Sequence, residues 1–176
     1  GTTKSGSANW AVFMTAALLK PTVKQVYAAG RESVTAGQEK VVRTGPNAVT
    51  VDMTMIRSAY TPDHFEVREG DKVTFRITNV ETVRDMTHGF ALPDHGLNVS
   101  LPPGGTKLIT IDAGKPGVYW FYCTNFCSAL HLEMRGRMVV QPKNSTVAIA
   151  DWKAGQNVKG IEVPGVPSTQ GADRAR

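Results

Sequence analysis

The sequence predicts an all-β fold, a β-sandwich of short strands, and three observations support this prediction. Apolar and polar residues alternate with a period of two in Val49-Thr-Val-Asp-Met53 and Val73-Thr-Phe-Arg-Ile77, the pattern of a strand with one buried face. Turn sequences separate such runs at Glu69-Gly70-Asp71 and Pro102-Pro-Gly-Gly105. Short strands at this spacing are typical of two packed sheets.

Further strands are expected along the rest of this region. They are the runs 47–55, 72–80 and 107–112, Gly117-Val-Tyr-Trp-Phe-Tyr122 and Arg137-Met-Val-Val-Gln141. A shorter apolar segment, His88-Gly-Phe-Ala-Leu92, is expected to pair with a neighbouring strand.

Composition divides the chain into three parts around one core. The 176 residues, 41% of them hydrophobic, are enough for one domain of ordinary size. Residues 1–46 are interpreted as a connector, with a helix-compatible stretch near Pro21 to Gly30 and a polar linker that closes at Gly45-Pro46. Residues 47–142 are the β domain. Residues 143–176 are expected to form an extended tail, with Trp152 packed on the chain's own sandwich.

Charge and hydropathy argue against two classes of partner. The net charge is +5, but lysine and arginine are scattered without interleaved aromatic residues, so nucleic acid is not expected to bind. We interpret the charge as a solvated basic surface, with docking to acidic surfaces as the alternative. No run approaches the roughly 20 apolar residues that span a bilayer, and Asn9–Leu19 is too short, so no membrane span is expected.

The most informative segment is Cys123-Thr-Asn-Phe-Cys127-Ser-Ala-Leu-His131-Leu-Glu-Met134. It places two thiols, an imidazole and a thioether at intervals of four, four and three residues. Soft donors of this kind select copper, zinc or iron–sulfur centres over hard cations. The segment therefore predicts a soft-metal site.

Several interpretations compete for these donors. A disulfide between the cysteines would close a loop too short to add much stabilisation. A zinc site would use Cys123, Cys127 and His131, but structural zinc sites usually have closer cysteine pairs and seldom recruit methionine. Mononuclear blue copper uses one cysteine, which leaves the other without a role. A dinuclear copper site, in which both thiolates bridge two metals, uses every donor and is favoured.

A dinuclear site also needs a second imidazole, and the chain has four histidines. His88 is the best candidate, because strand pairing can bring it beneath the cysteine loop. We interpret His64 as structural and His95 as an exposed loop histidine. Metal-bound imidazoles usually need an outer hydrogen-bond acceptor, and Asp85 is the candidate for His88. The alternative for Asp85 is a carboxylate on a surface turn.

Two stretches carry a family resemblance. Asp85-Met-Thr-His88-Gly-Phe90 and the run from Gly117 to Met138 resemble the C-terminal cupredoxin domain of nitrous oxide reductase, which carries a dinuclear copper centre called CuA. The resemblance covers most of residues 47–142 and implies a cupredoxin-like Greek-key β-sandwich with an N-terminal connector and an extended C-terminal tail.

The resemblance also implies a ligand set. In it, Cys123 and Cys127 bridge both coppers, and His88 and His131 each complete one metal. Met134 is the weak axial ligand and Asn125 contributes its backbone carbonyl. The family usually has tryptophan at the position of Asn125 and histidine at that of Ser128, so this chain departs twice without losing a ligand. Both changes are expected to tune the centre through burial and hydrogen bonding around the sulfurs.

The function implied is electron transfer. The domain or subunit would take single electrons from a periplasmic cytochrome c or cupredoxin. It would pass them to a catalytic copper cluster in a propeller, which lies on another domain of the same protein or on another chain. In the family that cluster is held by seven histidines, so this chain, with four, is expected to have no independent catalytic site. The resemblance extends to residues 1–46 as the connector to the propeller, and it implies a periplasmic or exported protein.

Two other classes remain open. The CuA domain of cytochrome c oxidase subunit II has the same ligands, but it has glycine after the second cysteine, where this chain has Ser128. A copper chaperone or storage protein would lose copper reversibly and show no fast electron exchange. The continuation Met134-Arg-Gly-Arg-Met138 favours the reductase family over both. A homo-oligomer is compatible with every one of these readings.

Overall fold

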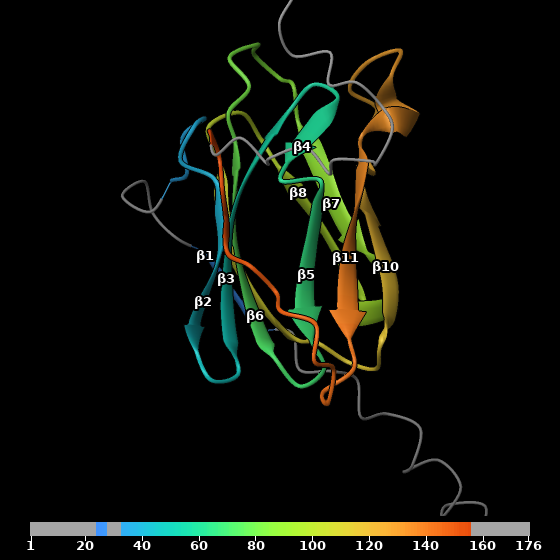
Figure 1. Cartoon of the computed structure of the whole chain (residues 1–176). Coiled ribbons are helices and arrows are strands. Elements are labelled where there is room, and N and C mark those ends of the chain that lie inside the picture. Colours follow the sequence, from blue (N-terminus) through green and yellow to red (C-terminus); the bar gives the residue numbers. More distant parts are fainter. Residues whose placement is uncertain (1–23, 28–32, 156–176) are drawn as a thin grey trace, which may run out of the picture.

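The computed structural model describes residues 24–27 and 33–155, which form two β-sheets packed face to face (Figure 1). The predicted all-β sandwich is confirmed. Short 3-10 helices occur at η2 (Pro93–His95) and η3 (His131–Glu133). In the part of the chain that the structure describes, no helix is long and apolar enough to cross a bilayer.

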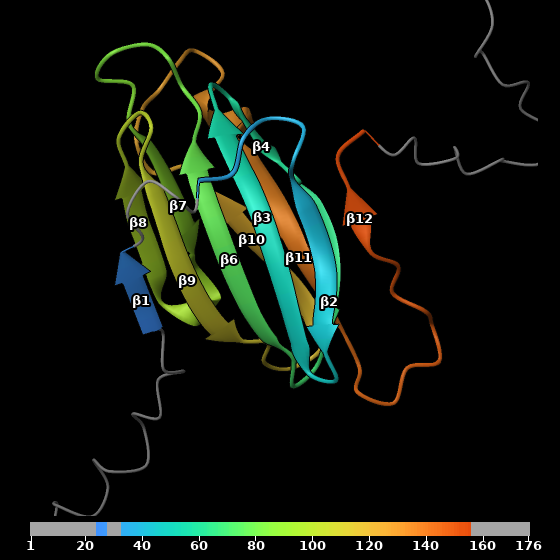
Figure 2. The same ribbon diagram turned by 90° about the vertical axis from the view of Figure 1, so that its left-hand side faces the viewer.

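The larger sheet has seven strands and faces the viewer in Figure 2. In spatial order its strands are β1 (Lys24–Tyr27), β9 (Thr106–Asp112), β6 (Lys72–Asn79), β3 (Ala48–Ile56), β2 (Lys40–Gly45) and β12 (Trp152–Lys153), with β4 (Ala59–Thr61) paired to β3. The contact between β3 and β6 is parallel, and the other pairs are antiparallel.

The smaller sheet carries the functional end of the molecule. Its strands, in spatial order, are β5 (His64–Arg68), β11 (Arg135–Gln141), β10 (Gly117–Tyr122), β7 (His88–Leu92) and β8 (Leu97–Leu101). β5 and β11 run parallel, while β10 pairs antiparallel with both β11 and β7. The loop from β10 to β11 therefore emerges beside the start of β7.

The alternating residues form the core, as the period-two pattern predicts. Inward-facing side chains of β3 and β6 are buried, and they meet an aromatic cluster whose ring centroids lie 5.3 to 6.1 Å apart. The cluster consists of Tyr60, Phe65, Phe75, Phe90 and Phe121. Edge and tilted contacts of this kind stabilise a core beyond the area they bury.

The expected three-part division needs correction at both boundaries. The stretch near Pro21 to Gly30 contains a strand, β1, whose backbone pairs with β9, and residues 40–45 of the expected connector form β2. Downstream, Trp152 pairs with Val41 and packs on the core, so the prediction that it docks on its own sandwich is confirmed. The remaining calls on residues 1–23 and 156–176, including Asn9–Leu19, lie outside the described residues.

Candidate metal centre

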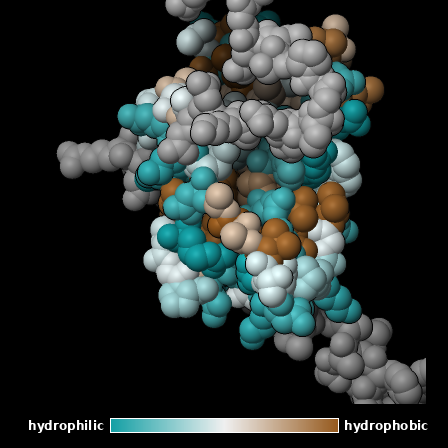
Figure 3. Space-filling view, in the orientation of Figure 1, coloured by the Kyte–Doolittle hydropathy of each residue, from teal (hydrophilic) through white to brown (hydrophobic). Residues whose placement is uncertain are grey.

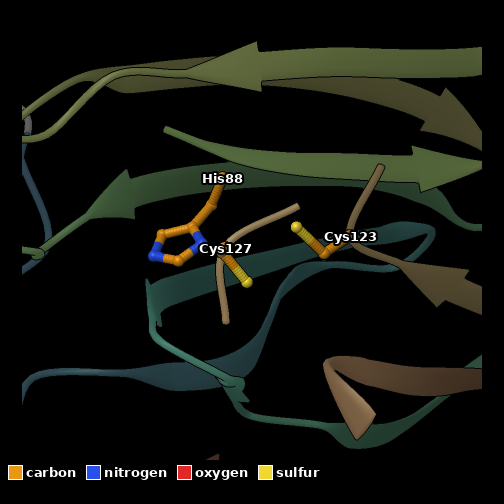
Figure 4. A group of neighbouring side chains, drawn as sticks. All are labelled: His88, Cys123 and Cys127. Atoms are coloured by element: carbon orange, nitrogen blue, oxygen red, sulfur yellow. The ribbon is translucent and has the colours of Figure 1, made fainter. Parts of the chain in front are cut away.

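The predicted ligands converge at one end of the sandwich, from three places in the chain. His88 begins β7, Cys123 follows the last residue of β10, and Cys127 lies in the loop to β11. One ligand atom from each of the three lies within 4.8 Å of the other two, and all three residues are buried (Figure 4). The two cysteines are free thiols.

His131 and Met134 complete the group through Cys127. The Sγ of Cys127 lies 3.7 Å from Nδ1 of His131 and 3.8 Å from Sδ of Met134. The turn of η3 produces this arrangement, since Met134 N–H donates to the His131 carbonyl at 3.1 Å. Cys123 N–H then donates to the Met134 carbonyl at 3.0 Å, which closes the loop where β10 and β11 meet.

The backbone carbonyl of Asn125 also faces the site. Its oxygen lies 3.2 Å from Cys123 Sγ, and the Gly89 N–H donates to the same sulfur at 3.2 Å. The chain thus brings two sulfurs, two imidazoles, a thioether and a carbonyl oxygen into one place. Every residue that the resemblance implies as a ligand lies in this group.

The Cys127 thiol is buried beside a second thiol. Burial, reinforced by the neighbouring Cys123, raises the pKa of the Cys127 thiol. Metal binding must therefore displace a proton from this sulfur, which couples metal affinity to pH. A soft metal ion would supply the charge that stabilises the thiolate.

His88 is oriented for metal binding. It is completely buried, and neither ring nitrogen has a hydrogen-bond partner. Nε2 lies 3.6 Å from Oε2 of Glu81, whereas Figure 4 shows the other nitrogen, Nδ1, on the side of the thiols. Burial lowers the pKa of His88, which Glu81 only partly offsets, so the neutral ring keeps a lone pair available. An unpaired buried nitrogen is costly, and a metal ion would satisfy it.

The carboxylate that lies beside the His88 ring is Glu81, at 3.6 Å, rather than Asp85. The side chain of Asp85 is 91% exposed, because its left-handed backbone, with φ of 64°, turns it into solvent beside Arg84. Glu81 is buried and receives N–H groups of Arg57 and Val83 at 3.3 and 3.4 Å. Burial opposes its ionisation, but these hydrogen bonds and the charge of Arg57 lower its pKa overall.

Sequence reasoning missed Glu81, because its position depends on contacts that form only in the fold. It lies just after the end of β6 (Lys72–Asn79), where the buried Asn79 accepts the Glu81 N–H at 3.0 Å. The same Asn79 donates to the carbonyls of Met86 and Leu101 at 3.0 and 2.9 Å. Asn79 and Glu81 thus stabilise the connection between β6 and β7, which determines the position of His88.

The two departures from the family pattern both make side-chain hydrogen bonds. Ser100 Oγ donates to Asn125 Oδ1 at 2.9 Å, and the hydroxyls of Ser58 and Ser128 lie 2.5 Å apart. Ser128 Oγ also accepts the Leu130 N–H at 3.1 Å. Ser128, in the ligand loop, is therefore tied to Ser58, which lies in the turn between β3 and β4.

The other two histidines lie away from this group. His64 begins β5 and is exposed, paired in register with Arg137. His95 is buried, so the expectation of an exposed loop histidine is wrong: η2 folds its ring against Tyr119, with centroids 5.0 Å apart. Burial lowers the pKa of His95.

Apolar side chains surround the site on the molecular surface. Phe126, Leu130 and Leu132 are 83%, 63% and 81% exposed, and Figure 3 shows hydrophobic residues at the upper right, over the end that carries η3. We call these three residues the apolar rim. Beside it, a hollow reaches the ligands, lined by Trp120, Tyr122, Cys123, His131, Leu132, Met134 and Arg135.

Comparison with known proteins places the chain among copper-protein folds. It is 47% identical to nitrous-oxide reductase of Stutzerimonas stutzeri over 103 residues, which is 58% of this chain and 16% of that protein. The enzyme of Cupriavidus necator is 43% identical over 127 residues, 70% of this chain and 19% of that protein. The chain thus spans less than a fifth of the length of these reductases.

A second group of relatives is closer in length. Cytochrome c oxidase subunit 2 of Thermus thermophilus is 33% identical over 103 residues, 58% of this chain and 73% of that protein. A heme-copper terminal oxidase structure shares the fold with a TM-score of 0.52 and 23% identity, over 74% of this chain and 84% of that one. The family model of the cupredoxin-like domain matches residues 14–140, and this chain belongs to that family.

Proposed function

We propose that the chain transfers electrons through a dinuclear CuA copper centre. The observation that carries this proposal is the convergence of His88, Cys123 and Cys127 within 4.8 Å, with His131 and Met134 beside Cys127. Cys123 and Cys127 would hold two coppers, with His88 and His131 completing the ligands, and the bound pair would supply one-electron exchange. Copper is the metal that this soft donor set fits best.

Two metals account for the donors better than one. A mononuclear blue-copper site needs only one thiolate, and here two buried thiols share the site with two imidazoles. A zinc site would leave the Met134 thioether without a role, although Sδ lies 3.8 Å from Cys127 Sγ. His88 and His131 approach from different segments, which fits one imidazole for each metal.

The rigid surroundings of the ligands support a role in electron transfer. His88 is held by β7, and both ends of the cysteine loop are held by the pairing of β10 with β11. A scaffold that fixes its ligands limits the rearrangement between oxidation states. The chain's own contribution is therefore to position donors, exclude water and keep the His88 ring neutral.

We infer that the redox partner docks on the apolar rim. Exposed apolar groups beside a buried metal offer a contact surface that desolvates easily on association. The donor would be a small electron carrier such as a cytochrome c or a cupredoxin, in a periplasmic or exported setting. The acceptor would be a catalytic copper cluster in a propeller domain or chain, as the family resemblance of the sequence implies.

A second candidate has its own support. The relative from Thermus thermophilus is matched over 73% of its length, so the chain is similar to most of an oxidase subunit 2. In that case the acceptor would be an oxidase rather than a copper cluster. The higher identity to nitrous-oxide reductase, 47% against 33%, favours the reductase assignment.

Stopped-flow mixing of the copper-loaded chain with reduced cytochrome c tests the function. We expect rapid reoxidation of the cytochrome, with one electron accepted per pair of coppers, and none with the metal-free chain. Thr74→Val, far from the site in β6, is the matched control and is expected to behave like the original chain. Copper that is lost readily to a chelator, with no electron exchange, would instead identify a chaperone or storage protein.

A further inference from the structure

The ligand loop rests on the smaller sheet in a notch at Gly89. A methyl group added at Gly89 would lie 2.6 Å from the backbone nitrogen of Thr124 and 2.8 Å from Oδ1 of Asn125. Because the first of these is a backbone atom, a larger residue would push the loop away. Gly89 therefore lets residues 124 and 125 lie directly on β7.

The neighbouring strand holds the loop in this notch. In β8, Asn98 and Ser100 alternate with buried Leu97, Val99 and Leu101, so they lie on the outer face of the sheet. Thr124 Oγ1 donates to Asn98 Oδ1 at 3.0 Å, and Ser100 Oγ donates to Asn125 Oδ1 at 2.9 Å. Ser100 is paired in register with Gly89, so the second bond crosses the notch itself.

Both bonds act on the residues that present the carbonyl. Asn125 carries the backbone oxygen that lies 3.2 Å from Cys123 Sγ, and Thr124 links it to that cysteine. The Gly89 N–H, in the floor of the notch, donates to the same sulfur. The position of the Asn125 carbonyl oxygen and the environment of the Cys123 thiol thus both depend on how the loop packs in the notch at Gly89.

We propose that Asn98 and Ser100 are positioning residues, which fix the Asn125 carbonyl toward the metal by bonding the side chains of Thr124 and Asn125. The inference rests on the proposed copper function. Asparagine at position 125 is essential to it, because its side-chain oxygen is the acceptor that Ser100 requires, whereas an indole offers no acceptor. The second half of the loop is attached separately, through Ser58 and Ser128.

Four variants test the proposal. Ser100→Ala and Asn98→Ala each remove one bond, and Ser100→Thr keeps the hydroxyl in a residue that suits a strand. Thr74→Val is the control, because it removes a hydrogen bond between the hydroxyls of Thr74 and Thr110, which lie 3.1 Å apart on the larger sheet. The measurements are the copper hyperfine couplings, the rate of copper release to a chelator, and amide hydrogen exchange of residues 124–126 in the metal-free chain.

The two alanine variants are expected to release copper roughly two- to fivefold faster, as the loss of a surface hydrogen bond implies. Their hyperfine couplings change, and residues 124–126 of the metal-free chain exchange faster. Ser100→Thr and Thr74→Val keep the original values. Unchanged couplings and unchanged exchange in both alanine variants would overturn the proposal.

Failure of the copper function itself gives a different result. If the original chain takes up no copper, the proposed function is wrong, and the test of the positioning role is then the exchange measurement on the metal-free chain. The exchange measurement still separates the two, since it reports whether Asn98 and Ser100 hold the loop without any metal. Copper uptake by all variants, with identical spectra and identical exchange of residues 124–126, contradicts the positioning role alone.

Discussion

The Oε2 atom of Glu81 lies 3.6 Å from Nε2 of His88, and both side chains are almost completely inaccessible to solvent. The carboxylate is kept ionised by the Arg57 and Val83 N–H groups and by the Arg57 guanidinium, 3.6 Å away. An anion behind a ligand imidazole orients the ring and increases its basicity. Glu81 therefore connects Arg57, in the turn between β3 and β4, to the candidate ligand His88.

Replacing Glu81 with glutamine tests this relationship. The variant keeps the size of the side chain but loses its charge, so copper affinity should fall roughly ten- to hundredfold. The reduction potential should rise, because the anion stabilises the more positive, oxidised centre. Copper competition titration and redox titration measure the two effects. Asp85→Asn, at the exposed position, should change neither, and an equal effect there would contradict the assignment.

Cys127→Ser should convert the centre to a mononuclear one. A serine hydroxyl stays protonated and is a far weaker ligand for copper than a thiolate, so the donors that remain are Cys123, His88, His131 and Met134. Two imidazoles, one thiolate and a thioether form the donor set of blue copper. Metal analysis should find one copper per chain with a four-line spectrum and a strong blue colour. Two coppers in this variant would mean that Cys127 is not a bridge.

The apolar rim should control association rather than stability. Phe126→Ser and Leu132→Ser remove side chains that are 83% and 81% exposed, so the free energy of unfolding should change by less than about 0.5 kcal/mol. The second-order rate of electron exchange with reduced cytochrome c should fall roughly tenfold, since apolar groups at the centre of an interface carry much of its energy. Val147→Ser, in the tail, is the control.

Folding stability should depend on pH through Asp71. This buried carboxylate accepts two hydrogen bonds from Arg43, at 2.8 and 2.7 Å, and one from the Arg68 N–H at 2.7 Å. Burial opposes its ionisation, but these bonds lower its pKa overall. The stabilisation is therefore complete above the unfolded value of about 3.9 and is lost as the pH falls through the lower folded value.

Urea unfolding of the metal-free chain between pH 7 and pH 2 measures this contribution. Asp71→Asn should cost about 1 to 3 kcal/mol at pH 7, because Arg43 loses its charged partner, and should flatten the acid branch of the profile. Asp112→Asn, whose side chain is 59% exposed beside Lys72, is the matched control. An acid branch that persists in Asp71→Asn would assign the pH dependence to another group.

The strands and the cysteine loop could be predicted because their signals are local. Apolar and polar residues alternate from Val49 and from Val73, and this alternation predicts each strand without reference to the rest of the chain. The donors from Cys123 to Met134 likewise lie within one short segment. Glu81, Asn98 and Ser100 could not be predicted, since their roles depend on strand register and on a notch at Gly89. For Asp85 the sequence leaves a role beside His88 and a surface turn both open, and the exposed turn that the structure shows depends on the local backbone rather than on proximity to His88.

The boundaries failed for a related reason. β1 and β12 are short strands whose place is fixed by pairing with β9 and β2, far away in the chain. His95 likewise looked like a loop residue beside Asp94 and Gly96, but η2 turns its ring onto Tyr119. In each case a non-local contact overrides the local pattern.

The central claim is that two coppers share Cys123 and Cys127. Electron paramagnetic resonance with copper quantification on the copper-loaded chain tests it most directly. The account predicts two coppers per chain and a seven-line hyperfine pattern from one unpaired electron shared equally by both nuclei. One copper with a four-line pattern, or a silent chain that holds zinc, would contradict it.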